Sequence, residues 1–142
     1  MRDVGCLFCA VVVGDEPARV VLETDDVVGF LDNRPVCKGH TLLVTRRHVD
    51  TLIELSDDVL FSVFHAVRRV AGAVRGGLGA QGSFVAMNNV VSQSVQHVHV
   101  VPRTKGDGLP GFFWPRTTYK TRTEAESYAA LIRETLANRK SW

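Results

Sequence analysis

Short hydrophobic runs separated by turn-forming residues fill most of the first hundred positions of the chain. Residues 20–23 and 27–31 are two such runs on either side of a Thr-Asp-Asp turn, which predicts a β-hairpin. Further strands are expected at residues 41–45, 84–87 and 95–101, where β-branched and aromatic residues are frequent. The pattern therefore predicts five strands.

A helical period of hydrophobic positions lies between the third and fourth predicted strands. From residue 59 to residue 74 such positions recur every three or four residues, which predicts an amphipathic helix. Ser56 and the two aspartates after it are typical of a helix start, and the glycine-rich residues 76–79 of a helix end. Residues 6–13 predict either a short helix or an irregular apolar segment, and residues 124–138 predict a C-terminal helix.

The order of these elements predicts an α+β fold. We expect a five-stranded antiparallel sheet with the long helix on one face and a C-terminal helix. A chain of 142 residues suits one domain, residues 1–142, with residues 104–142 packed on it as an extension. The aromatic run Phe112-Phe113-Trp114 in this extension could pack over the sheet edge, line the substrate site or join a dimer interface.

The last predicted strand carries the chemically most informative pattern. His97 and His99 fall on one face and Val98 and Val100 on the other, so the valines face the long helix and the imidazoles face away. Two histidines in this arrangement suggest a metal site or nucleophilic and acid–base chemistry. The polar residues Ser92, Gln93 and Ser94 precede them, and such side chains and backbone amides suit phosphate oxygens.

Composition narrows the classes of protein further. The chain is 45% hydrophobic and 23% charged with a net charge of +2, so we expect neither membrane insertion nor nucleic-acid binding. The N-terminus has no apolar signal core, which favours a cytoplasmic protein. Three cysteines argue against a disulfide framework, and a Cys-x-x-Cys pair in a reducing compartment is more often a metal or redox element.

The run Gln93-Ser94-Val95-Gln96-His97-Val98-His99, followed by Val-Pro-Arg, resembles the signature of the histidine triad (HIT) family. The likeness covers about residues 4–103 and is nearest to the bacterial HIT hydrolases related to the Hint branch. It continues upstream in four short segments: Cys6-x-x-Cys9, Phe30-Leu31-Asp32, Gly39-His40-Thr41 and Arg47-His48.

The chain departs from this family by having two alternating histidines where the pattern has three. Aligned on the upstream Gln-Ser-Val, His99 takes the position of the nucleophile and Val101 the third position. Aligned on the downstream Pro-Arg, His97 is the nucleophile and His99 is third. We favour the upstream alignment, because its polar residues contact phosphate in the family. The missing histidine puts activity in question.

The resemblance implies a site for a purine nucleotide similar to AMP. His99 would attack the α-phosphate and form a nucleotidyl-histidine intermediate, supported by His97 and His40. Asp32 would accept hydrogen bonds from the ribose hydroxyls, and Asn88 or Asn89 would reach the sugar or phosphate. The resemblance assigns further residues to two groups: Ser92, Gln93 and Ser94 on the phosphate, and Leu7, Phe8, Val11, Phe30 and Leu31 around the base.

The resemblance also implies a structural zinc ion and a homodimer. The zinc ligands would be Cys6, Cys9, His48 and His97, and the dimer would form through the long helix and a shared sheet. The expected function is hydrolysis or transfer at the α-phosphate of adenosine phosphoramidates, AMP esters or dinucleoside polyphosphates. Two alternatives stay open, a catalytically impaired nucleotide-binding module and a zinc-stabilised interaction protein.

Overall fold

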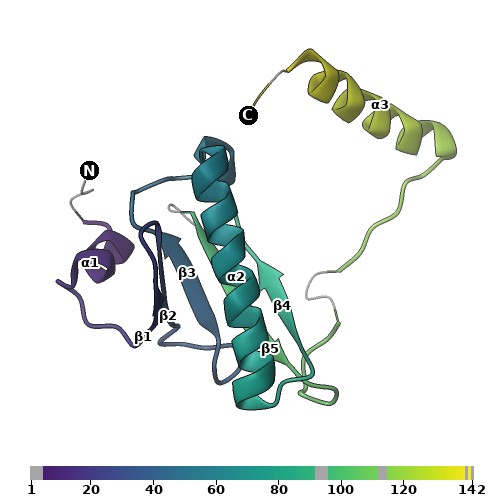
Figure 1. Cartoon of the computed structure of the whole chain (residues 1–142). Helices are drawn as coiled ribbons and strands as arrows, with labels where there is room; N and C mark the ends of the chain where they lie inside the picture. Colours follow the sequence, from purple (N-terminus) through teal and green to yellow (C-terminus); the bar gives the residue numbers. More distant parts are fainter. Residues whose placement is uncertain (1–4, 92–95, 112–114, 140, 142) are drawn as a thin grey trace. The chain divides into compact units, whose positions relative to one another are not determined.

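The computed structural model describes residues 5–91, 96–111, 115–139 and 141. Five antiparallel strands form one sheet in the order β1-β2-β3-β5-β4 (Figure 1). This is the α+β arrangement that the hydrophobic pattern predicts. The strands are β1 (Val20–Glu23), β2 (Val27–Leu31), β3 (Thr41–Thr45), β4 (Gly82–Ala86) and β5 (His97–Arg103).

The helices end where the local sequence predicts. The long helix α2 (Asp57–Leu78) begins after Ser56, whose hydroxyl accepts the Val59 N–H, and ends at Gly79, which has a φ of 71°. The other helices are α1 (Leu7–Val13), α3 (Arg122–Asn138) and the 3₁₀ turn η1 (Leu52–Glu54). Among the described residues, none of the helices is long and apolar enough to cross a membrane.

The structure divides into two compact units, residues 1–107 and residues 108–142. The sheet, α1 and α2 belong to the first unit, and α3 belongs to the second. The packing of the extension on the rest of the domain therefore stays a prediction.

The face of the sheet that α2 covers is aliphatic. Val98 and Val100 of β5 and Leu43 of β3 are all fully buried there. They pack against the apolar stripe of α2, which contributes Val63, Ala66, Val67, Val70 and Val74. Burial of this much aliphatic surface is the main source of stability for the sheet and helix.

The opposite face of the sheet carries a second, smaller core. It consists of Val11 from α1, Val28 and Phe30 from β2, and Leu42 and Val44 from β3. In the antiparallel register Leu42 lies opposite His99 and Val44 lies opposite His97. Directly opposed residues share a face, so the histidines lie on the side away from α2, as the alternation predicts.

Candidate functional site

His99 and His40 meet on this second face. His99 lies in the middle of β5, and His40 is the residue directly before β3. Nε2 of His40 and Nδ1 of His99 are 2.9 Å apart, and His40 is only 3% exposed. The two residues are 59 positions apart in the chain, and the pairing of β3 with β5 brings them together.

A glycine makes this position of His40 attainable. Gly39 has a φ of 97°, a conformation that residues with a Cβ rarely adopt. A Cβ at position 39 would also collide with Leu78, the last residue of α2. Gly39 therefore allows a tight approach to the helix end just before the chain enters β3.

The second ring nitrogen of His40 has partners in the loop before it. Nδ1 of His40 accepts the backbone N–H of Val36 at 3.1 Å. The carboxylate of Asp32 lies 3.8 Å from the same nitrogen, and its other oxygen accepts the N–H of Arg34 at 2.8 Å. Asp32, His40 and His99 thus form one group, whose ligand-type atoms all lie within 4.8 Å of one another.

Both imidazoles are held in the neutral form. Burial, together with the nearby His97 and His40, lowers the pKa of His99 to about 4, while Asp32 opposes the shift. Burial also lowers the pKa of His40, and here too Asp32 opposes the effect. A neutral imidazole keeps a lone pair, which a nucleophile or an acid–base group requires.

His97 lies beside this pair. Its ring centroid is 4.8 Å from that of His99 and 4.6 Å from that of Phe8 on α1. Val101, two residues beyond His99 on the same face, is 3% exposed and lies opposite Phe84 of β4. The third alternating position of this face, after His97 and His99, is therefore occupied by a buried apolar side chain, that of Val101.

Three of the predicted base-pocket residues, Phe8, Val11 and Phe30, belong to the second core. Phe30 and Val11 are 5% and 8% exposed, and Phe8 packs against Phe30 with ring centroids 6.0 Å apart. Leu31 is half-buried at the end of β2, whereas Leu7 on α1 is 60% exposed. Phe8, Val11 and Phe30 thus line the side of the sheet that carries the histidines. Leu31 alternates with Phe30 and lies on the α2 side instead, beside Thr41 and Val70, so the structure does not bring it to the predicted base pocket.

The two asparagines after β4 differ in their contacts. The side-chain oxygen of Asn89 accepts the N–H of Leu52 at 2.7 Å, so it fixes the start of η1. Asn88 is exposed at the end of β4. The predicted phosphate-binding residues Ser92, Gln93 and Ser94, like the aromatic run 112–114, lie outside the described residues.

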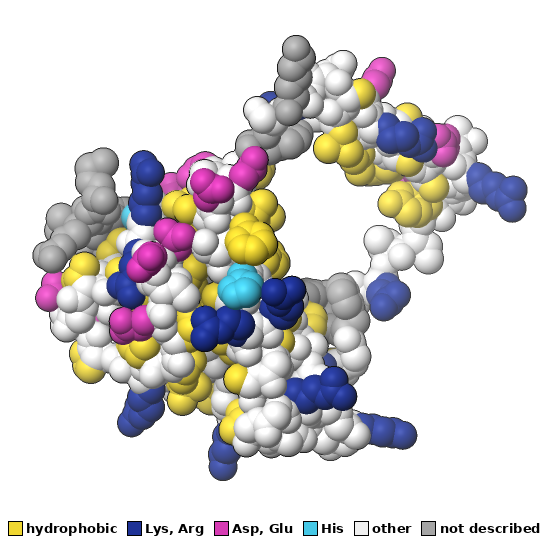
Figure 2. All heavy atoms as spheres, viewed as in Figure 1, with side chains coloured by type: hydrophobic (Ala, Val, Ile, Leu, Met, Phe, Trp, Pro, Cys, Tyr) yellow, Lys and Arg dark blue, Asp and Glu magenta, His cyan; other side chains and the backbone are white. Residues whose placement is uncertain are grey.

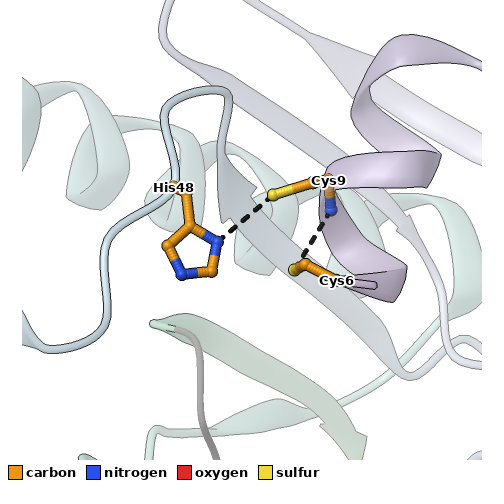
Figure 3. Close-up of side chains that lie close together, drawn as sticks. All are labelled: Cys6, Cys9 and His48. Atoms are coloured by element: carbon orange, nitrogen blue, oxygen red, sulfur yellow. Dashed lines mark hydrogen bonds between the residues drawn. The ribbon is translucent and has the colours of Figure 1, made fainter. Parts of the chain in front are cut away.

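A group of two thiols and one imidazole forms at the start of α1 (Figure 3). The ligand-type atoms of Cys6, Cys9 and His48 lie within 4.8 Å of one another, and Sγ of Cys9 is 3.2 Å from Nδ1 of His48. Nε2 of His48 is 2.9 Å from the carboxylate of Asp50, which directs Nδ1 towards the sulfur atoms. His97 is not a member of this group.

This donor set fits zinc. Two sulfur atoms and an imidazole nitrogen are three of the four ligands in a tetrahedral zinc site. Burial raises the pKa of the Cys6 thiol, while the backbone N–H of Cys9 lowers it. A metal ion would have to displace the thiol proton, so its binding would release protons and depend on pH.

Two residues that contact the histidines of these groups, Val36 and Asp50, were not identified from the sequence. Val36 acts through its backbone N–H, which gives no pattern in the sequence. Asp50 follows His48 at a distance of two residues, and a carboxylate so close to a candidate metal ligand is a signal that could have been used.

Comparison with known proteins gives consistent matches. A family model described as HIT domain matches residues 13–106. A solved structure of a HIT family member from Bacillus subtilis superposes with a TM-score of 0.79 at 31% identity, covering 92% of this chain and 96% of that chain. A zinc-bound histidine triad family protein from Mycobacterium smegmatis superposes with a TM-score of 0.71 at 32% identity, covering 95% and 99%. The adenosine 5'-monophosphoramidase hnt1 of Schizosaccharomyces pombe is 33% identical over 114 residues, which are 78% of this chain and 83% of that protein.

Proposed function

The chain belongs to the HIT family, and we propose that it hydrolyses adenosine nucleotide derivatives at the α-phosphate with His99 as the nucleophile. The observation that carries this proposal is the half-buried, neutral His99 hydrogen-bonded through Nδ1 to His40. A relative that acts on adenosine 5'-monophosphoramidate supports a phosphoramidate as substrate. AMP esters and dinucleoside polyphosphates present the same α-phosphate.

The reaction proceeds in two displacements. Nε2 of His99 forms a bond to the α-phosphorus while the bond to the leaving nitrogen or oxygen breaks, and the leaving group takes up a proton. Water then attacks the nucleotidyl-histidine, releasing the nucleoside monophosphate and the free imidazole. Positioning and charge stabilisation supply most of the acceleration of such a transfer.

The remaining residues bind and orient the nucleotide. Asp32 accepts the ribose hydroxyls, Asn88 or Asn89 reaches the sugar or phosphate, and the phosphate oxygens bind at residues 92–94. Phe8 and its neighbours enclose the base.

Trapping of the intermediate tests this function. A reaction with labelled adenosine phosphoramidate is quenched, and the protein is digested at alkaline pH, where phospho-histidine linkages survive. Label on His99 is expected. Label on His97 would overturn the upstream alignment and assign attack to that residue.

The second candidate is a nucleotide-binding module without turnover. The observation that favours it is Val101, which is buried and cannot donate or accept a hydrogen bond beside the histidines. Tight binding of AMP with no label on either histidine would support this module and contradict the hydrolase. Absence of both binding and label would support a zinc-stabilised interaction protein.

We further propose structural zinc at Cys6, Cys9 and His48, with His97 as the fourth ligand. The converging sulfur and nitrogen atoms support the first three, and the zinc-bound relative supports the metal. Elemental analysis of protein purified without added metal should find about one zinc ion per chain. Stability unchanged by a strong chelator would contradict the site.

We also propose a homodimer that forms through α2 and β4. Phe61 and Phe64 on α2 are 71% and 42% exposed, and β4 is an edge strand on which Val85 is 42% exposed. Figure 2 shows hydrophobic side chains beside a histidine and arginines over α2. Exposed apolar surface next to an unpaired strand edge is typical of an interface. Sedimentation that returned only monomer at micromolar concentration would contradict this proposal.

Two proposals concern the whole chain. We infer a reducing, cytoplasmic location because the three cysteines, all within the described residues, form no disulfide. We infer that residues 104–142 pack on the domain because α3 carries an apolar stripe that is exposed within its own unit, including Leu131 and Ile132. Hydrogen exchange of α3 amides as fast as in an isolated peptide would contradict that packing.

A further inference from the structure

A backbone amide determines where the protons lie in the His40–His99 pair. The Val36 N–H can only donate, so Nδ1 of His40, 3.1 Å away, must accept with its lone pair. A neutral His40 then carries its proton on Nε2. That proton points at Nδ1 of His99, 2.9 Å away, so Nδ1 of His99 is an acceptor.

The consequence for His99 is a proton on its other nitrogen. A neutral imidazole has one N–H, and His99 must carry it on Nε2 when Nδ1 accepts. Under the proposed function Nε2 is the atom that attacks phosphorus. With a proton there it has no lone pair in the ring plane, so the arrangement described is a resting one.

Asp32 offers the pair a second arrangement. Its carboxylate lies 3.8 Å from Nδ1 of His40, the nitrogen that now accepts from Val36. If the Val36 amide turned away, a proton on Nδ1 of His40 could be donated to Asp32. Nε2 of His40 would then accept from Nδ1–H of His99, and Nε2 of His99 would have its lone pair.

The exchange between the two arrangements conserves protons. One proton arrives from solvent at Nδ1 of His40, and one passes from Nε2 of His40 to Nδ1 of His99. One proton leaves Nε2 of His99 to solvent. Each imidazole carries one N–H before and after the exchange.

The loop that holds the Val36 amide has little side-chain packing at Val36 itself. Residues 32–39 form turns and bends between β2 and β3, and Val36 is 53% exposed, so little packing fixes its peptide. The same loop begins with Asp32, the proposed ribose ligand. A nucleotide that binds there touches the segment that determines the proton positions.

We propose that His40 is a positioning residue that holds His99 in its non-attacking tautomer at rest, and that nucleotide binding releases it by moving the Val36 amide and engaging Asp32. This inference rests on the proposed function, which identifies Nε2 of His99 as the attacking atom.

The resting state can be measured directly by NMR. Two-bond ¹H–¹⁵N correlations of ¹⁵N-labelled protein at neutral pH report which nitrogen of each imidazole carries the proton. We expect Nε2–H for both His40 and His99 in the protein without nucleotide, and Nδ1–H for both after AMP is added. Nδ1–H on His99 before AMP is added, or no change on saturation with AMP, would overturn the proposal.

A pair of variants isolates the amide. Val36→Pro removes the N–H without changing either imidazole, and should shift His40 and His99 to Nδ1–H without AMP. Val36→Ala keeps the N–H and should leave the spectrum of the resting protein unchanged. Identical tautomers in the two variants would overturn the proposal.

This measurement is independent of turnover. A protein with the expected tautomers that hydrolyses no nucleotide would contradict the proposed hydrolase and leave the role of His40 intact. An active protein with Nδ1–H on the resting His99 would support the hydrolase and contradict the proposed role of His40.

Discussion

Two groups of side chains within residues 1–107 each contain a histidine, and the imidazole has different partners in each. In the first group His48 faces two thiols, and its second nitrogen is held by Asp50 at 2.9 Å. In the second group His40 faces another imidazole, and its second nitrogen is held by a backbone amide. The atoms within each group lie within the same 4.8 Å. Proximity alone therefore does not determine the chemistry.

The difference lies in where the lone pairs point. In the first group the sulfur atoms and one imidazole nitrogen converge, and soft donors of this kind suit zinc. In the second group the imidazoles satisfy each other with a hydrogen bond, so a metal ion would have to break that bond. The first group is therefore suited to holding an ion and the second to moving protons.

Replacement of the nucleophile should have the largest effect. His99→Asn should lower turnover of adenosine phosphoramidate by about a thousandfold or more, because the proposed mechanism forms the intermediate on this imidazole. AMP affinity should change little, since its contacts lie on other residues. Initial rates and calorimetric titration measure the two quantities, and His65→Asn on α2 serves as the control. Turnover within about tenfold of the parent protein would exclude His99 as nucleophile.

Removal of one thiol should abolish metal binding by the group of Cys6, Cys9 and His48. Cys9→Ser should lose the zinc ion and lower the melting temperature by about 5 °C or more, as a loss of roughly 1–2 kcal/mol does in a domain of this size. Cys37→Ser lies outside the group and should keep both the metal and the melting temperature. Elemental analysis and thermal unfolding measure the outcome. Equal metal content in the two variants would exclude a thiolate site.

Replacement of Asp50, whose carboxylate is hydrogen-bonded to His48, should have a smaller effect. Asp50→Asn should weaken zinc binding by about tenfold, since the carboxylate orients the imidazole without touching the metal. Competition with a chromophoric chelator gives the affinity. Asp32→Asn, the matched change in the other group, should leave zinc affinity unchanged. Equal losses in both variants would mean that the effect is general destabilisation.

The last prediction is a pH dependence of stability. His99 has a pKa of about 4 in the folded protein and about 6.5 when unfolded, so between these values the unfolded chain binds more protons. The free energy of unfolding should therefore fall as pH decreases from about 6.5 to 4. His99→Asn should show a shallower slope in denaturant titrations at several pH values. A slope unchanged by the substitution would contradict the lowered pKa.

Periodicity predicted the fold, and local motifs predicted only parts of the groups. The alternation of His97 and His99 with valines was enough to place the histidines opposite α2. The Cys-x-x-Cys spacing indicated the thiol group because its members are close in sequence. The upstream histidine of each group, His40 and His48, was identified by family resemblance.

Periodicity and spacing alone did not predict the contacts between residues that are distant in the sequence. The distance between His40 and His99 depends on the register of β3 with β5, which is set by packing on both faces of the sheet. The role of Val36 could not be predicted because its side chain takes no part. The expected closeness of His97 to the thiols stays a prediction, as do the phosphate contacts of residues 92–94.

The glycine before β3 links the two layers of the protein. Helix α2 is 22 residues long, and its last residue, Leu78, lies against Gly39, the neighbour of His40. Any residue larger than glycine at position 39 would press on the Leu78 side chain and would also have to adopt a φ of 97°, so one substitution there would disturb the helix end and the entry of His40 into the site together.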